Sequence, residues 1–162
     1  MDEPGRWWLS LVYIAVILVA AVGAVLAPLT VFFVGSPTEG LPGIVATGGI
    51  VGGMSALVWV CLRAPAVRNR LRPGAVSISA SAATFIAVGW TFLAVSGTHS
   101  YRDSDDAFWA RLPFALAACV PVLVVAVCAL TISRFIQRDD ARRAAAARHS
   151  REVASGTGRL RG

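Results

Sequence analysis

The stretch Ala46–Leu57, ATGGIVGGMSAL, lies within an apolar segment, yet four of its twelve residues are glycine. In a water-exposed helix each glycine costs roughly 1 kcal/mol relative to alanine. Between helices in lipid, association depends instead on close van der Waals approach, which glycine permits. Small residues four apart share one helix face, and here they form two adjacent ridges: Gly48, Gly52 and Ala56, and Gly49 with Gly53. The stretch therefore predicts a membrane helix with a smooth groove for a second helix.

The rest of the chain has the composition of a membrane protein. Of its 162 residues 56% are hydrophobic, and the mean hydropathy is +0.67. The hydrocarbon core of a bilayer, about 30 Å thick, is crossed by about 20 apolar residues in a helix. Four runs of that length or more contain no charged side chain: Leu9–Val34, Leu41–Leu62, Ala75–Gly97 and Leu112–Ser133. We predict an all-α integral membrane protein, a four-transmembrane-helix up-down-up-down bundle with a basic cytoplasmic C-terminal helix or tail.

The chain divides into a membrane domain and a tail. Residues 1–136 form the predicted membrane domain, with spans at about 8–34, 41–62, 75–97 and 112–136. Residues 137–162 form a basic cytoplasmic tail, partly disordered, with fraying expected at Ser155–Gly158. We interpret the first run as a span and not a signal peptide, because its flank is acidic on balance and its apolar stretch exceeds the roughly 7–15 residues of a signal core.

The distribution of arginine predicts the orientation. Arginine supplies all fifteen basic residues, a usage typical of a GC-rich bacterial genome. Cytoplasmic loops carry an excess of positive charge. With both termini inside, thirteen arginines face the cytoplasm and two face out. We therefore predict a multi-pass protein of the cell (cytoplasmic) membrane with its N- and C-termini in the cytoplasm.

The glycine groove has two candidate partners. The first is the helix at 75–97, which a short loop joins to the glycine-rich helix; in a symmetrical hairpin Gly48 meets Gly89. The second is another copy of the protein, because the motif alone does not distinguish partners. We expect the first, with Ile50 on a side that faces lipid.

Tryptophan and proline give further expectations. Four of the five tryptophans fall where the headgroup level is predicted, whereas Trp90 lies deeper. Pro28 and Pro121 are expected to kink their helices. Pro113 is expected in the first turn of its span, where no backbone donor is lost. A polar cavity between Pro28 and Pro121 would favour a transporter, and a tightly filled bundle would favour an accessory protein.

No catalytic, cofactor-binding or metal-binding constellation is recognisable in the sequence. The spans hold no carboxylate, which a proton-coupled exporter requires. The three cysteines form no C-x-x-C pair and are interpreted as buried small hydrophobes. The third loop carries His99, Asp103, Asp105 and Asp106, but lacks the spacing of a calcium loop. We interpret Ser104 as a helix N-cap whose following aspartates stabilise the first turn.

The second loop and the tail contain most of the arginines. In the tail, Asp139 is expected to pair with Arg142 or Arg143, and Asp140 with Arg143, at helical spacing. The tail is expected either to lie along the inner leaflet, where a partner with an acidic surface would compete for it, or to be a solvated helix that only fixes the topology. Nucleic acid is not expected, because stacking aromatics are missing. The candidate contacts for anionic lipid or a partner are Arg63, Arg68, Arg70, Arg72, Arg138, Arg142, Arg143, Arg148 and Arg151.

The function predicted from these features is that of a non-enzymatic accessory, scaffold or regulatory interaction protein without a cofactor. Its expected surroundings are the lipid bilayer and anionic lipids of the inner leaflet, and its candidate partners are another membrane protein or a second copy. A small oligomeric transporter or channel is the alternative. A membrane enzyme that uses the outer loop ranks third.

Overall fold

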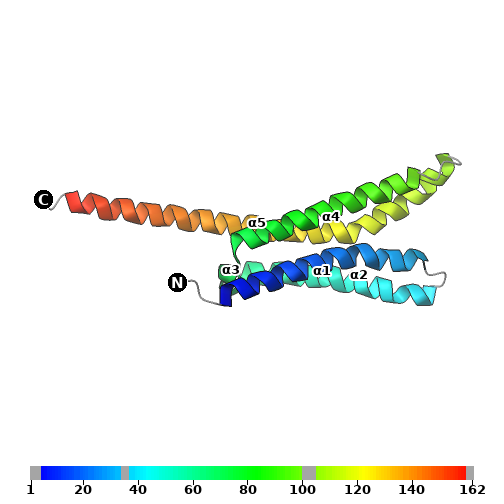
Figure 1. Ribbon diagram of the computed structural model, residues 1–162, viewed down its shortest axis with the longest axis horizontal. Helices are drawn as coiled ribbons and strands as arrows, with labels where there is room; N and C mark the ends of the chain where they lie inside the picture. The colour runs from blue at the N-terminus through cyan, green and yellow to red at the C-terminus, as the bar shows by residue number, and fades with distance from the viewer. Residues whose placement is uncertain (1–4, 34–36, 100–104, 160–162) are drawn as a thin grey trace.

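The computed structural model describes residues 5–33, 37–99 and 105–159, which form five helices (Figure 1). These are α1 (Gly5–Phe33), α2 (Pro37–Arg63), α3 (Pro65–Arg70), α4 (Pro73–His99) and α5 (Asp105–Arg159). Among the described helices, α1, α2, α4 and α5 are long and apolar enough to span a membrane. Each of these four helices overlaps one of the four apolar runs of the sequence.

The long helices are arranged as two pairs that lie side by side (Figure 1). One pair is α1 with α2, and the other is α4 with α5; α1 also contacts both helices of the second pair, and α2 contacts α5. The short α3 packs against α1 and α2 at one end of the bundle. At this end α5 continues past the other helices. We call it the basic end and define it as residues 63–73 with residues 134–151.

Small side chains line the contact between α4 and α5. The buried positions of α4 recur every three or four residues, at Val76, Ala80, Ala83 and Ala87. Those of α5 recur at the same spacing, at Val122, Val125, Ala129, Ile132 and Ile136. This spacing forms one stripe along each helix, and alanine lets the two backbones approach closely. The core follows this contact, and the buried residues of α1, including Ile17 and Ala21, belong to the same cluster.

Prolines define the short helix α3, in a segment that the sequence predicted as a loop. Pro65 stands at the first helical positions, where its missing N–H costs nothing and its fixed φ is already helical. Ala64 before it is extended, with φ −104° and ψ 92°. Leu71 is extended again, and Pro73 disfavours a helical conformation at Arg72. The six residues of α3 are thereby held as a separate turn of helix across the end of the bundle.

The bounds of α5 differ from the prediction at both ends. The helix begins at Asp105, so Pro113 lies inside it and not in its first turn, and the prediction for Pro113 was wrong. The start at Asp105 agrees with the capping interpretation, although Ser104 lies outside the described residues. At the other end the helix continues through residues 155–158, where fraying was predicted, to Arg159.

Candidate functional site at the basic end

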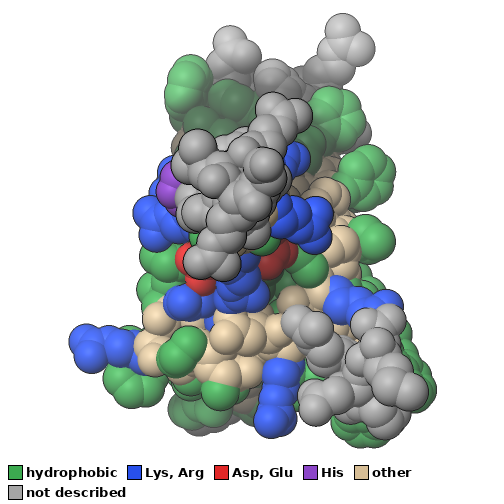
Figure 2. All heavy atoms as spheres, turned by 90° about the vertical axis from the view of Figure 1, so that its left-hand side faces the viewer, with side chains coloured by type: hydrophobic (Ala, Val, Ile, Leu, Met, Phe, Trp, Pro, Cys, Tyr) green, Lys and Arg blue, Asp and Glu red, His purple; other side chains and the backbone are tan. Residues whose placement is uncertain are grey.

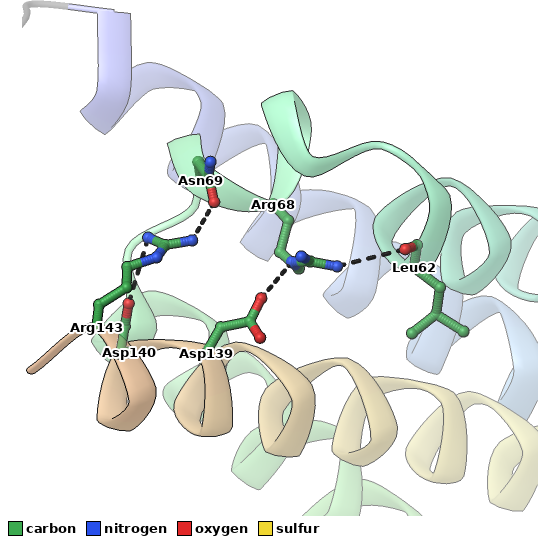
Figure 3. A network of polar contacts seen from close by, with 6 residues as sticks. All are labelled: Leu62, Arg68, Asn69, Asp139, Asp140 and Arg143. Carbon is green, nitrogen blue, oxygen red and sulfur yellow. Dashed lines mark hydrogen bonds and ion pairs between the residues drawn. The ribbon is translucent and has the colours of Figure 1, made fainter. Parts of the chain in front are cut away.

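An ion pair joins the two helix pairs at the basic end. Nε of Arg68 on α3 lies 2.6 Å from Oδ2 of Asp139 on α5, and the two side chains are only 19% and 17% exposed (Figure 3). Arg68 also donates through Nη1 to the carbonyl oxygen of Leu62, at 3.3 Å. The expected pairing of Asp139 with arginines of its own helix was wrong, because α3 brings Arg68 to it.

A second link lies beside the first. Nη2 of Arg143 on α5 donates to Oδ1 of Asn69 on α3, and Nη1 of Arg143 lies 3.7 Å from Oδ1 of Asp140. The pairing of Asp140 with Arg143 is confirmed. Figure 3 shows that the two arginines reach in opposite directions, Arg68 from α3 toward α5 and Arg143 from α5 toward α3. The crossing contacts fix α5 against α3 at two successive turns.

We call the contacts of Arg68 and Arg143 between α3 and α5 the junction. Helix α1 joins it through Ser10. Its buried hydroxyl accepts a hydrogen bond from the backbone N–H of Arg72, at 3.1 Å. Close to these polar contacts in the sequence, Leu71 and Ile136 are only 4% and 3% exposed, and both belong to the core cluster. The basic end is therefore the boundary at which the apolar core gives way to charged groups.

A pocket of about 250 Å³ lies between these contacts. Its apolar walls include Leu71 and Ile136. Its polar walls are Arg68, Asn69, Arg72, Asp139, Asp140 and Arg143. Three guanidinium groups and two carboxylates give the lining a formal net charge of +1. Figure 2 shows this end of the molecule, with arginine side chains around the carboxylates.

The predicted arginine contacts separate into three groups. Arg68, Arg72 and Arg143 line the pocket. Arg63 stands over the ring of Trp59, with 5.9 Å from its guanidinium carbon to the ring centroid. The remaining five are exposed and do not line this pocket: Arg70, Arg138, Arg142, Arg148 and Arg151. The sequence did not indicate the roles of Asn69, Asp139 and Ser10 in the junction, because all three act on segments distant along the chain.

Past the junction α5 continues as an exposed helix. Every residue from 141 to 151 is exposed, and this segment, which we call the basic arm, holds four arginines and no acidic residue. The arm follows the direction of the apolar part of α5 away from the bundle (Figure 1). The helix is continuous from Asp105 to Arg159, and contact of the tail with the inner leaflet stays a prediction.

No other described helix covers the glycine face of α2. Apart from adjacent residues and the nearby backbone of α2 itself, no described atom lies within 4 Å of the position that a Cβ would occupy at Gly48, Gly49, Gly52 or Gly53, and Ala56 is exposed. Gly89 on α4 is equally open. The predicted packing of α4 into the groove was wrong, because α4 packs against α5 and α1 and has at most a marginal contact with α2. A second copy in the groove stays a prediction.

The close contact of α2 with α1 lies on another face of α2. Cδ1 of Ile50 is 3.1 Å from the position of a Cβ at Gly23 on α1. Ile50 is half-buried against the core and does not face lipid as expected. Gly49 and Gly53 instead border an apolar groove of about 740 Å³ between α1 and α2.

Near Pro28 and Pro121 lies a smaller groove, of about 430 Å³. Pro28, Pro121, Ala118 and Gly48 are among its lining residues, and Thr47, its hydroxyl-bearing member, donates to the carbonyl oxygen of Gly43 at 2.8 Å. The lining carries no charged side chain. The cavity expected of a transporter is present by position, but its walls are apolar.

Trp90, which did not fit the headgroup level, has a different role. Its Nε1–H donates to the carbonyl oxygen of Ala118, at 3.3 Å, and so ties α4 to α5 three residues before Pro121. The four other tryptophans are exposed, at Trp7, Trp8, Trp59 and Trp109.

The third loop, which joins α4 to α5, lies largely among the residues that the structure does not describe. Asp103 is among the residues that the structure does not describe, and His99, Asp105 and Asp106 are described only as parts of helices. The structure therefore does not test whether this loop binds a ligand.

Comparisons with protein-family models, with curated proteins and with solved structures found no match to this chain. The junction and the arm are therefore interpreted from their own geometry.

Proposed function

We propose that this chain is a multi-pass protein of the cytoplasmic membrane, with four spans in an up-down-up-down bundle and both termini inside. The proposal rests on four helices of sufficient length and hydropathy. It also rests on the positive-inside distribution of arginine, with thirteen of fifteen arginines on one side. In this orientation the basic end faces the cytoplasm.

We further propose that the protein is an accessory or scaffold subunit whose basic arm binds an acidic protein surface. The observation that carries this proposal is the arm itself, with four arginines, no acidic residue and every residue exposed. The positive charge of residues 141–151 favours a partner of the opposite sign and speeds its encounter.

The distance of the arm from the membrane surface favours a protein partner over the lipid leaflet. Ile136 is the last buried residue among those of α5 whose side chains are described, and from it to Arg151 the helix rises roughly 22 Å at 1.5 Å per residue. At physiological ionic strength attraction to a charged surface decays over about 8 Å. If α5 keeps its direction, Arg148 and Arg151 lie beyond effective reach of the lipid headgroups.

The contacts of the junction help to keep the arm helical. An isolated helix shorter than about 12–15 residues is marginal in water because its nucleation is costly. Here the apolar part of α5 supplies the nucleus, and the contacts of Arg68 and Arg143 hold the last buried turns in place. The arm is thereby presented as a preformed surface.

The test is co-purification with crosslinking from native membranes. A variant with Arg142, Arg148 and Arg151 changed to Glu should lose its crosslinks to acidic protein segments while the bundle keeps its melting temperature. The matched control changes the same three residues to Lys and should retain the partner. Crosslinks from the arm to lipid alone, or equal capture by both variants, would contradict the proposal.

The transporter alternative finds less support. Its expected cavity at Pro28 and Pro121 has apolar walls without a charged group, and the four apolar runs hold no charged side chain. A polar or ionic substrate would therefore meet no compensating group on this route.

A further inference from the structure

We propose that Ser150, on the basic arm, is a phosphorylation site whose modification releases the acidic partner. The effect on binding rests on the function proposed above, in which the arm attracts an acidic protein surface. The modifying enzyme is a protein kinase that selects serine next to arginine, and its co-substrate is a nucleoside triphosphate.

Ser150 carries the only hydroxyl group among the side chains of the basic arm. Residues 141–151 include no threonine, no tyrosine and no second serine. Ser150 is exposed, as is every other residue of the arm. Its Oγ donates to the carbonyl oxygen of Ala146 at 2.9 Å, a bond within its own helix. An enzyme can therefore reach this hydroxyl without any change in the bundle.

The helix around Ser150 opens without disturbing the core. A kinase binds its substrate as an extended segment, so the turn that holds Ser150 must unwind before the reaction. None of the residues 141–151 is buried, so unwinding there gives up no burial of apolar side chains. Segments of this kind open locally at a free energy far below that of global unfolding. The junction lies about two turns before Ser150 and stays closed during this opening.

The charges next to Ser150 favour a kinase that recognises arginine. Arg148 stands two residues before Ser150, and Arg151 follows it directly. In an extended segment both guanidinium groups flank the hydroxyl. Kinases discriminate among substrates by such charge patterns, and here the complement is a set of acidic groups beside the catalytic site of the kinase.

The reaction transfers one phosphoryl group to Ser150. Its Oγ forms a bond to the γ-phosphorus, the bond from that phosphorus to the oxygen bridging it to the β-phosphorus breaks, and the nucleoside diphosphate leaves. The hydroxyl proton passes to the carboxylate base of the kinase. The four arginines give the arm a formal charge of +4. Phosphoserine adds about −1.5 to −2 at neutral pH, so the charge of the arm falls by nearly half.

Neighbours along the helix do not neutralise the added phosphate. Side chains on a helix pair at spacings of three and four residues. The four positions at these spacings from Ser150 are uncharged: Ala146, Ala147, Val153 and Ala154. Arg143, two turns earlier, already contacts Asn69 and Asp140. The phosphate therefore stays on the surface of the arm, where it repels an acidic partner.

The first experiment determines whether Ser150 carries phosphate in the cell. The full chain is purified from native membranes with phosphatase inhibitors, and fragment mass spectrometry assigns each phosphate to a residue. We expect a fraction phosphorylated at Ser150, and we expect this signal to disappear in the Ser150→Ala variant and after phosphatase treatment. Absence of phosphate from Ser150 in both growing and resting cells would overturn the proposal.

The second experiment tests the role of the neighbouring arginine. The full chain in neutral detergent is incubated with MgATP and the cytosol of the native cells as the source of kinase. Arg148→Gln should slow the phosphorylation of Ser150 several-fold. The matched control is Arg138→Gln, which removes an exposed arginine of the same helix outside the arm and should react as the wild type does. Equal rates for the two variants would contradict recognition through Arg148.

The third experiment tests the release of an acidic partner, with a labelled polyglutamate peptide as the probe. The phosphorylated chain should bind this peptide roughly tenfold more weakly than the unphosphorylated chain, because nearly half of the charge of the arm is cancelled. Ser150→Glu should weaken binding in the same direction, whereas Ser150→Gln, its uncharged match, should bind as the wild type does. Equal binding with and without phosphate would overturn the proposed release.

Failure of the function proposed above has a different signature. In that case the unphosphorylated chain itself would not bind polyglutamate, and there would be no partner to release. The phosphate on Ser150 is read by mass and does not depend on a partner, so the first experiment decides the modification site by itself.

Discussion

Cδ1 of Ile50 on α2 lies 3.1 Å from the place that a Cβ on Gly23 of α1 would occupy. This is closer than ordinary van der Waals contact. The close approach between α1 and α2 at this point is therefore at a glycine of α1, and not at one of the four clustered on α2, which have open space around them.

Gly23→Leu is expected to destabilise the protein by about 1–3 kcal/mol, because the added side chain overpacks the contact with Ile50. Gly52→Ala should leave stability unchanged or raise it by up to about 1 kcal/mol, since the position is open and alanine favours the helix. Unfolding in detergent measures both. A large loss at Gly52 with oligomer dissociation in light scattering would place a second copy in the glycine groove.

Arg68→Ala and Asp139→Ala are each expected to cost about 1.5–3 kcal/mol, because each leaves a largely buried charge without its partner. The double variant should cost less than the sum of the two. A double-mutant cycle in detergent measures the coupling, with exposed Arg142→Ala as control. Strict additivity would mean that the two side chains do not interact.

Trp90→Phe should cost about 0.5–1.5 kcal/mol, because Phe keeps the ring but loses the hydrogen bond to Ala118. Trp59→Phe, at a position 62% exposed, is the matched control and should change stability little. Thermal unfolding of the two variants side by side decides between them. Equal values would show that the indole N–H contributes nothing.

Reporter fusions test the proposed topology. Fusions after Arg70 and after Ala144 should report the cytoplasm, because both sites belong to arginine-rich segments. A fusion after Ser100 should report the outside. An outside reading at Arg70 would exclude the four-span arrangement proposed here.

The four long helices were predictable because hydropathy is a local property of the chain. The helix faces that form the contact between α4 and α5 were partly predictable as well. Ser79, Ala83 and Ala87 stand four residues apart and so share one face of α4, and all three are buried. Their partner was not predictable, since a ridge of small residues fits any helix that approaches it.

The candidate site was predictable only in part. Asp140 and Arg143 stand three residues apart on one helix, so their pairing followed from helical periodicity. The pairing of Arg68 with Asp139 depends on the direction in which α3 leaves α2, which Pro65 and Pro73 set within a segment too short to show periodicity.

The sequence alone determined the number of apolar helices, the excess of arginine at one end and the helical character of the tail, because each depends on neighbours along one chain segment. The tertiary structure decided that the glycine face of α2 is left open, that Trp90 ties α4 to α5, and that three of nine candidate arginines meet in one pocket. These outcomes depend on which faces of distant helices come together. Packing in three dimensions selects among faces that are locally equivalent in the sequence.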